Sequence, residues 1–284
     1  MEFKCIIAPH HLLRERDHKA MSDRSWTIKA LWIGDTLSLI EQLSLASFVK
    51  CGHEVELFTY NHVAMVPDGV TIRDANEILG KEKIFLYRER PSYAGFANWF
   101  RYIMLYKEGG VWIDTDMVCL KRFDFDSPLF FGMEAFDRYN CAVVGAEPNL
   151  ALFSFLARQV ENPNDYLPYD TKKERKTKFK RKYLKGNQRG NVKWGETGPR
   201  GFTRAINHFE LQSHGLPFTA FYPIHSECWT AIFDDTFPSI EAYFPDTYAI
   251  HLWNEMMRRR DDFDKNRDFS KNSLLAALKR RYLD

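Results

Sequence analysis

The sequence predicts an α/β fold with parallel strands, because apolar strand patterns and a helical pattern alternate near its start. Residues 27–32, TIKALW, have the composition of a buried strand. A helix is expected over residues 38–50, and residues 55–60, VELFTY, form the next strand. This strand–helix–strand order is typical of parallel pairing in a doubly wound sheet.

Composition supports a globular protein with a sizeable core. Of the 284 residues, 45% are hydrophobic, 15% aromatic and 27% charged, which excludes a disordered chain. A net charge of +2 is too small to indicate a nucleic-acid-binding protein, and no apolar run approaches the ~18–20 residues that span a bilayer. The apolar run near the N-terminus is too short for a secretory signal. Five dispersed cysteines without a CxxC pair indicate reduced thiols in a cytoplasmic protein and exclude a zinc ribbon.

The most informative segment is residues 96–116, FANWFRYIMLYKEGGVWIDTD. Its first part predicts a helix, because apolar residues recur at helical spacing and would face a core. Asn98 and Arg101, three residues apart, would share a different face of this helix. Gly109 and Gly110 are expected to end the helix, since glycine adopts left-handed conformations at no steric cost.

Two aspartates end the short apolar strand that is expected at residues 111–114. Asp114 and Asp116 are two residues apart, so their side chains would point the same way on an extended backbone. Two carboxylates at a strand end suit a Mg²⁺ or Mn²⁺ ion that also holds a substrate's phosphates. An isolated Asp-x-Asp is more often a pair of solvated loop residues or a helix cap. The preceding helix, glycine pair and strand favour the metal site here.

The rest of the chain predicts further strands at 129–133 and 140–145 and a helix at 149–160. Residues 171–193 then form a strongly basic stretch. This stretch is either a solvated, mobile insertion or a patch that meets an anionic membrane surface or a phosphorylated acceptor. Residues 273–283 are expected to form a short helix with a solvated basic face.

Three further features indicate a ligand site, although each also has a purely structural interpretation. Trp32 ends the first strand at the edge where α/β sheets bind ligands, so it would either stack on a nucleobase or belong to the core. His251, in YAIHLWNE (248–255), points away from its apolar neighbours and would be either a third metal ligand or a structural histidine. The turn 195–204, GETGPRGFTR, would either bind an anion or only connect elements. The sequence contains no Walker loop, GxGxxG or GxSxG motif.

Four segments, in this order, resemble the glycosyltransferase family 32 enzymes, which include the α-1,4-galactosyltransferase-like proteins. They are the strand end WIG (32–34), the helix–glycine–DxD block, the turn TGPRGFTR followed by FYPI, and HLWN. The sugar-transferring domain of the large clostridial toxins is a more distant relative with the same helix–DxD block. The resemblance covers about residues 27–255. It implies a GT-A fold, with a single Rossmann-like nucleotide-binding sheet and an acceptor-binding remainder. One domain would span residues 1–284, with a basic insertion at about 171–193 and a helical tail at about 256–284.

The resemblance also implies roles for individual residues. Asp114 and Asp116 would bind Mn²⁺ (or Mg²⁺), and His251 would join them from a C-terminal segment that closes over the pyrophosphate. Arg101 would act with the two aspartates in catalysis by contacting the donor sugar. The chain departs from the usual SD..RY pattern, because Asn98 replaces an aspartate that binds sugar hydroxyls, and this change leaves the identity of the sugar open. The positions expected to bind the nucleotide or the donor sugar are Trp32, Ile33, Gly34, Asn98, Arg101, Thr115, Asn140, Gly198, Trp253 and Asn254.

The resemblance therefore predicts a metal-dependent, retaining glycosyltransferase that moves a hexose or N-acetylhexosamine from a UDP-sugar to a saccharide or lipid-linked acceptor. The product would be a surface polysaccharide or another glycan, made in the cytoplasm or peripherally on the inner face of a membrane. Two other classes stay open. A metal-dependent phosphohydrolase, which usually needs more clustered carboxylates, would hydrolyse a phosphodiester without a sugar donor. A catalytically silent UDP-sugar-binding module would bind UDP with Mn²⁺ and show no turnover.

Overall fold

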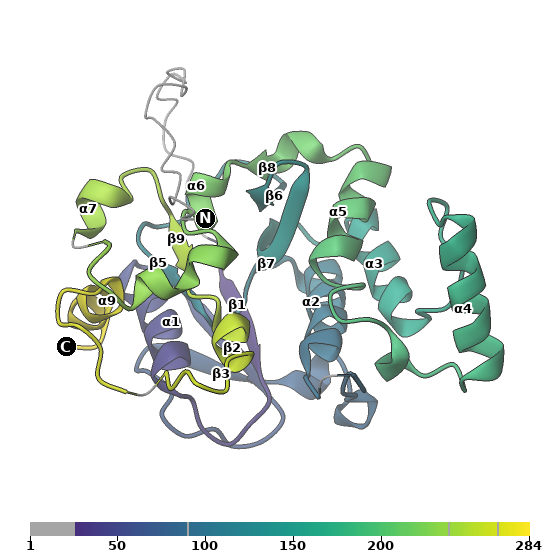
Figure 1. Ribbon diagram of the computed structural model, residues 1–284, viewed down its shortest axis with the longest axis horizontal. Helices are drawn as coiled ribbons and strands as arrows, with labels where there is room; N and C mark the ends of the chain where they lie inside the picture. The colour runs from purple at the N-terminus through teal and green to yellow at the C-terminus, as the bar shows by residue number, and fades with distance from the viewer. Residues whose placement is uncertain (1–25, 90, 238, 266) are drawn as a thin grey trace.

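The computed structural model describes residues 26–284, apart from positions 90, 238 and 266 (Figure 1). The short N-terminal apolar run and Cys5 lie outside these residues, and Cys51, Cys119 and Cys141 are free thiols. Among the described helices, none combines the length and the apolar character that a membrane span requires.

A seven-stranded mixed sheet forms the centre of the fold, which confirms the predicted α/β class. Its strands follow the order β3-β2-β1-β4-β7-β6-β8. The first four of these are parallel, β7 is antiparallel to both β4 and β6, and β8 is parallel to β6. The strands are β1 (Ile28–Trp32), β2 (Val55–Thr59), β3 (Val70–Asp74), β4 (Gly110–Ile113), β6 (Leu129–Ala135), β7 (Arg138–Ala146) and β8 (Gly215–Leu216).

Each predicted strand of the central sheet is present, but the edge strand β3 was not predicted. The burial of β3 shows why, since Thr71, Ile72 and Asp74 are exposed and no alternating apolar pattern marks the strand. Two short strands, β5 (Met117–Cys119) and β9 (Ala249–His251), form a separate antiparallel pair. This pair brings the C-terminal part of the chain next to the end of β4.

Helices cover both faces of the central sheet (Figure 1). On one face, α1 (Leu39–Lys50) and α9 (Leu274–Tyr282) pack in a cluster that includes Phe48 and Leu278. On the other face, α2 (Ala94–Glu108), α3 (Ala151–Glu161) and α5 (Pro199–His208) pack around Trp99, Phe100 and Phe202. The helices predicted from periodicity are therefore confirmed. The remaining helices are α4 (Lys172–Leu184), α6 (Phe218–Phe221), α7 (Ile240–Tyr243) and α8 (Asn254–Arg258).

The two glycines after α2 turn the chain sharply from this helix into β4. Gly109 has a φ of 65° and Gly110 a φ of 96°, which confirms the predicted left-handed helix stop. A Cβ atom on Gly109 would lie 2.7 Å from the carbonyl oxygen of Ala146, so a larger residue would also collide with the end of β7. This tight turn sets the position of β4 and of the aspartates that follow it.

The basic stretch folds into helix α4. The sequence left open whether this stretch is a solvated, mobile insertion or a patch that meets a membrane surface or a phosphorylated acceptor. The helix begins with a capping box, in which Thr171 and Glu174 exchange hydrogen bonds with each other's backbone. Two of its basic side chains, those of Lys178 and Arg181, are buried against the rest of the protein. Helix α4 is thus attached through charged residues, an arrangement that hydrophobic periodicity does not detect.

Candidate active site

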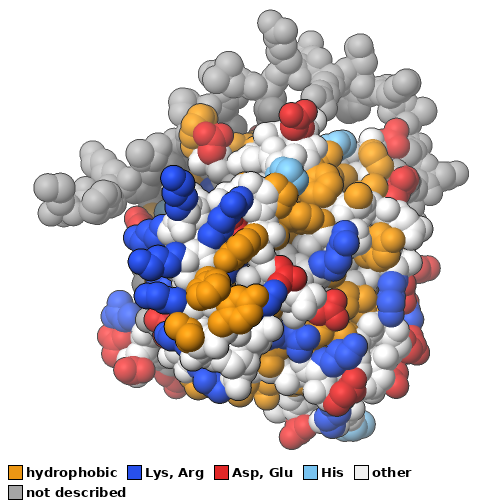
Figure 2. All heavy atoms as spheres, turned by 90° about the vertical axis from the view of Figure 1, so that its right-hand side faces the viewer, with side chains coloured by type: hydrophobic (Ala, Val, Ile, Leu, Met, Phe, Trp, Pro, Cys, Tyr) orange, Lys and Arg blue, Asp and Glu red, His pale blue; other side chains and the backbone are white. Residues whose placement is uncertain are grey.

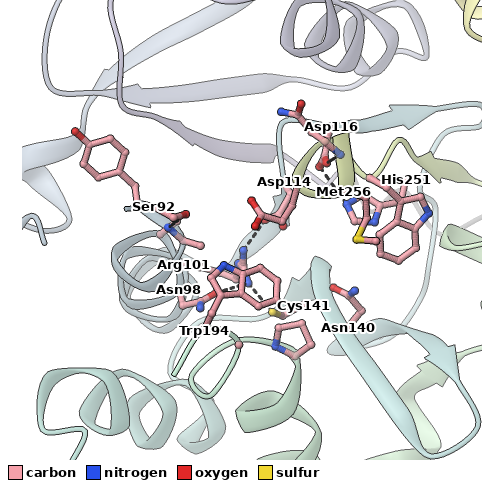
Figure 3. A pocket seen from close by; sticks show the side chains of 18 of the residues that line it. Ser92, Asn98, Arg101, Asp114, Asp116, Asn140, Cys141, Trp194, His251 and Met256 are labelled. Carbon is pink, nitrogen blue, oxygen red and sulfur yellow. Dashed lines mark hydrogen bonds and ion pairs between the residues drawn. The ribbon is translucent and has the colours of Figure 1, made fainter. Parts of the chain in front are cut away.

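A cavity of about 1040 Å³ opens at the ends of β1 and β4 (Figure 3). Its wall contains residues from β1, α2, the turn after β4, the β6–β7 hairpin, the start of α5 and the segment around α8. It brings together most of the residues predicted for the site: Trp32, Ile33, Asn98, Arg101, Asp114, Thr115, Asp116, Asn140, His251, Trp253 and Asn254.

Two predicted site residues, Gly34 and Gly198, are not among the residues that line the cavity. Each lies next to the side chain of a residue that does. A Cβ atom on Gly34 would approach Nε1 of Trp32 to 3.0 Å, and one on Gly198 would approach Nδ2 of Asn98 to 3.1 Å. The two glycines therefore give room to site side chains.

Asp114 and Asp116 converge for a different reason from the one predicted. They are not on an extended strand, because β4 ends at Ile113 and β5 begins at Met117. The backbone N–H of Met117 donates to the carbonyl oxygen of Asp114 at 3.0 Å, which closes a turn around Thr115. The expectation of an extended Asp-x-Asp was thus wrong, and the turn brings the carboxylates together.

Asp116 is held from the C-terminal part of the chain. In the β5–β9 pair, Met117 lies opposite His251, so Nε2 of His251 is 3.2 Å from Oδ1 of Asp116. The backbone N–H of Asn254 donates to the other carboxylate oxygen at 2.8 Å. Burial raises the pKa of Asp116, but the attraction of His251 and these hydrogen bonds outweigh it, so the net pKa is lowered. Burial likewise lowers the pKa of His251, and the nearby Asp116 reverses this, so its net pKa is raised.

Asp114, Asp116 and His251 have the chemistry and the spacing of a divalent metal site. One ligand atom from each residue lies within 4.8 Å of the others. Nδ1 of His251 is buried and has no hydrogen-bond partner within the described chain, so the imidazole retains unused capacity. Two hard carboxylates and one imidazole fit Mn²⁺ or Mg²⁺. The three residues therefore fit the predicted metal.

Arg101 connects α2 to the first aspartate. Its Nη2 atom is 2.5 Å from Oδ1 of Asp114, and Trp112 Nε1 donates to the same oxygen at 2.7 Å. The guanidinium also lies 4.8 Å from the centre of a Trp112 ring. Burial disfavours the charged guanidinium, but the attraction of Asp114 exceeds this effect and the pKa of Arg101 is raised. Arg101 thus remains cationic at the bottom of the cavity.

Asn98, the departure from the family pattern, orients Arg101. Its Oδ1 atom accepts a hydrogen bond of 3.0 Å from Nη1 of Arg101. Because the amide carries no net charge, it binds the guanidinium without neutralising the positive charge of Arg101. The positive charge of Arg101 is therefore available to Asp114 and to a ligand in the cavity.

Trp32 is a half-buried residue of the cavity wall and not a fully buried core residue. Its indole N–H donates to the carbonyl oxygen of Thr36 at 3.1 Å, so the ring is anchored by the loop that follows β1. This arrangement leaves part of the aromatic ring accessible from the cavity. Stacking on uracil stays a prediction.

Sequence reasoning missed several charged residues of the cavity wall. The Glu134 carboxylate accepts a 2.9 Å hydrogen bond from Nδ2 of Asn140 and lies 3.2 Å from Nη2 of Arg138. These three residues lie at the facing ends of β6 and β7, both of which were predicted as strands. Their position at predicted strand ends is the sequence signal that could have identified them. Elsewhere on the wall, the guanidinium of Arg259 lies 4.5 Å from a ring centre of Trp194. The wall also contains Arg258, which was missed, and Arg200 and Arg204, which belong to the segment 195–204.

Two family models match successive parts of the chain. Residues 34–131 match a glycosyltransferase sugar-binding region containing a DXD motif, and residues 177–282 match an alpha 1,4-glycosyltransferase conserved region. Three segments of the predicted pattern fall within these matches: the DxD block, the turn TGPRGFTR followed by FYPI, and the HLWN segment.

Curated relatives are similar over a large part of this chain. The mouse (Mus musculus) lactosylceramide 4-alpha-galactosyltransferase is 27% identical over 199 residues, which cover 64% of this chain and 45% of the mouse protein. The human protein of the same name is 25% identical, with 64% and 46% covered. An uncharacterized glycosyltransferase of Acanthamoeba polyphaga mimivirus is 28% identical, with 45% and 44% covered. The chain thus spans about half the length of the curated relatives it matches.

Among solved structures, the PaToxG glycosyltransferase is similar with a TM-score of 0.43 and 13% identity, covering 66% of this chain and 70% of that one. The ligand-free glycosyltransferase domain of the YGT toxin has a TM-score of 0.45 and 9% identity, covering 68% and 79%.

The chain therefore combines a mixed sheet, a DXD turn at the end of β4 and matches to two glycosyltransferase family models. These matches and the curated relatives support the resemblance to the family 32 enzymes that the four motifs predicted.

Proposed function

We propose that this protein is a metal-dependent, retaining glycosyltransferase that moves a hexose or N-acetylhexosamine from a UDP-sugar to a saccharide or lipid-linked acceptor. The observation that carries this proposal is the gathering of Asp114, Asp116 and His251 within 4.8 Å beside the buried cation Arg101. All four residues line one cavity.

The three clustered residues would hold Mn²⁺ (or Mg²⁺), which supplies a Lewis acid for the departing nucleotide diphosphate. Arg101 keeps Asp114 in position and adds a second positive charge in a buried environment, where electrostatic stabilisation is most effective. Arginines from α5 and α8 on the cavity wall would attract the anionic donor. This division of roles needs no protein nucleophile.

The two ends of the donor would meet different walls of the cavity. Trp32 and Ile33, at the end of β1, would bind the uracil ring, with the indole as the stacking surface. Glu134, oriented by Asn140, would accept hydrogen bonds from sugar hydroxyls of the donor or the acceptor. Thr115, Trp253 and Asn254 line the space between these walls.

Two observations bear on the acceptor and on the alternatives. The curated relatives carry the name lactosylceramide 4-alpha-galactosyltransferase, which supports a lipid-linked glycan as acceptor and a membrane surface as the place of reaction. We propose the cytoplasmic face, with a surface polysaccharide or a lipid-linked glycan as product.

A phosphohydrolase is less well supported, since the metal-type cluster found among the described residues has only two carboxylates.

A calorimetric screen of UDP, GDP and CMP sugars, with and without Mn²⁺, tests this function. A UDP-sugar should bind only with the metal, and mass spectrometry should then detect its slow hydrolysis and its transfer to glycolipid acceptors. Mn²⁺-dependent binding without hydrolysis or transfer would instead identify a silent binding module. Phosphodiester cleavage without a sugar donor would identify a phosphohydrolase.

A further inference from the structure

Helix α4 is attached to the protein by its charged residues. Nζ of Lys178 lies 2.7 Å from Oδ2 of Asp170, and both side chains are buried. Arg181 makes a bidentate contact with Glu196 at 2.7 and 3.0 Å. Such buried or bidentate pairs fix the rotation of the helix about its axis, because no other rotation would pair both cations.

The same attachment links α4 to the wall of the active-site cavity. Glu174, on the attached side of the helix, accepts hydrogen bonds from Arg200 at 3.1 Å and from Arg204 at 2.9 Å. Both arginines belong to α5 and line the cavity. The orientation of α4 is therefore coupled to the orientation of the cavity.

The opposite face of α4 carries large apolar side chains in contact with solvent. Phe179 is 49% exposed, Tyr183 65% and Leu184 72%, and the rings of Phe179 and Tyr183 lie 4.8 Å apart. At 100° per residue, Phe179 and Tyr183 share the face on which four exposed lysines also lie, and Leu184 lies at the flank of this face at the end of the helix. None of these lysines forms an ion pair with a residue that the structure describes. The lysines are Lys172, Lys173, Lys176 and Lys180.

This amphipathic helix is inverted relative to an ordinary surface helix, since its apolar residues point outward. Figure 2 looks onto the side of the molecule where α4 lies and shows hydrophobic side chains gathered beside basic ones. A merely solvated basic helix would not need three large exposed apolar residues, two of them with their rings in contact, because exposed apolar patches mark interaction sites. The sole acidic residue of α4, Glu174, is on the attached side.

We propose that the outward face of α4 binds an anionic lipid bilayer, with Phe179, Tyr183 and Leu184 entering the headgroup region and the lysines contacting acidic lipids. Aromatic residues favour the membrane interface, and basic residues next to them bind anionic headgroups. The coupling of α4 to Arg200 and Arg204 then holds the cavity at the membrane surface. That consequence rests on the proposed lipid-linked acceptor, whereas the binding of α4 to the bilayer does not.

Vesicle flotation of the whole protein, without nucleotide or metal, tests the proposal. Phosphatidylcholine vesicles with phosphatidylserine should bind the protein more tightly than pure phosphatidylcholine vesicles. The Lys176→Ser/Lys180→Ser variant should bind the anionic vesicles about 30-fold more weakly, because each lysine near such a surface adds roughly fivefold. At high salt the electrostatic part of the binding is screened, because the Debye length is only ~3 Å at 1 M. The Phe179→Ser/Tyr183→Ser variant should weaken the binding that remains under these conditions.

Matched variants separate this effect from a general loss of charge or stability. Lys50→Ser/Lys271→Ser removes two exposed lysines away from α4, and Tyr243→Ser removes an exposed aromatic residue of α7, so both should bind as the parent does. Circular dichroism should show an unchanged fold in all variants. Equal vesicle binding by the α4 variants and the parent would overturn the proposal. Reduced activity on a soluble phosphorylated saccharide with unchanged vesicle binding would overturn it too, and would assign the patch to a phosphorylated acceptor.

Because this assay involves no sugar transfer, its outcome is independent of the proposed function. A protein that transfers sugar but ignores anionic vesicles would contradict only the membrane proposal. One that binds the vesicles through α4 but fails with every UDP-sugar would contradict only the proposed function.

Discussion

Nη2 of Arg101 lies 2.5 Å from Oδ1 of Asp114, and this contact joins a buried helix residue to the first aspartate of the DXD turn. The guanidinium is almost fully buried, whereas the side chain of Asp114 is 37% exposed. Asp114 is therefore fixed on one oxygen by the protein and keeps its other oxygen toward the cavity. The second aspartate, Asp116, is held on both oxygens, Oδ1 by His251 and Oδ2 by the backbone N–H of Asn254.

The contact of Arg101 predicts a catalytic effect. Arg101→Lys keeps the positive charge but loses the planar fork that reaches Asp114 and Asn98 together. We expect kcat to fall on the order of 10²-fold, the usual effect of removing one electrostatic contact to the transition state. The exposed Arg158→Lys on α3 is the control and should leave kcat unchanged. If Arg101→Lys and Arg158→Lys have the same kcat in steady-state kinetics, this result contradicts a role for Arg101.

The position of Trp32 predicts separate effects on binding and on stability. Trp32→Ala should weaken UDP binding by about 1–3 kcal/mol if the indole stacks on uracil. Since the side chain is only half-buried, the melting temperature should change little. Trp229, a buried core residue, is the matched control, and Trp229→Ala should lower the melting temperature. The opposite pattern for Trp32→Ala, a lower melting temperature with unaltered UDP affinity, would assign Trp32 to the core.

His251 should contribute a third ligand from the C-terminal segment. His251→Ala should lower Mn²⁺ affinity while Asp114 and Asp116 retain residual binding, and His251→Asn should keep part of the affinity through its amide oxygen. Titration of Mn²⁺ followed by electron paramagnetic resonance measures this series. If the parent and both variants bind Mn²⁺ equally, His251 is a structural histidine.

The buried His53 predicts a loss of stability at mildly acidic pH. Burial is the main reason that the pKa of His53 is lowered, and Nε2 of its ring accepts a 3.0 Å hydrogen bond from the backbone N–H of Phe123. The folded protein therefore binds this proton less readily than the unfolded chain, whose histidine pKa is about 6.5. As the pH falls below about 6.5, the unfolded state gains the proton first and the free energy of unfolding decreases.

Urea unfolding between pH 5 and 8 checks this, with His53→Gln as the comparison. The variant should show a smaller dependence of the free energy of unfolding on pH than the parent. Parallel pH curves for the two proteins would rule out His53 as the origin.

Local periodicity was sufficient to predict the central elements. Strands β1, β2 and β4 and helices α1 and α2 are buried by their own regular apolar patterns, and the glycine stop at 109–110 follows from conformational freedom. Strand β3 lacks such a pattern because it forms an exposed edge. The docking of α4 depends on Asp170 and Glu196, whose partners are set by tertiary structure and not by spacing in the sequence.

The sequence predicted which residues form the site better than it predicted how these residues are arranged. The motifs named the residues that meet in the cavity, but Asp114 and Asp116 converge through a turn, and His251 reaches them through the pairing of β5 with β9. Glu134 was missed because a single glutamate at a strand end resembles any solvated carboxylate until Asn140 and Arg138 are seen around it.

The central claim, that the DXD turn binds a metal which in turn binds UDP, is tested most directly by calorimetric titration of UDP into Asp116→Asn with and without Mn²⁺. The substitution preserves the shape of the side chain and removes its charge. The parent should bind UDP with Mn²⁺ and only weakly without it, whereas Asp116→Asn should lose the Mn²⁺-dependent part, with the exposed Asp246→Asn behaving as the parent. Equal Mn²⁺-dependent UDP affinity in the parent and in Asp116→Asn would contradict the account.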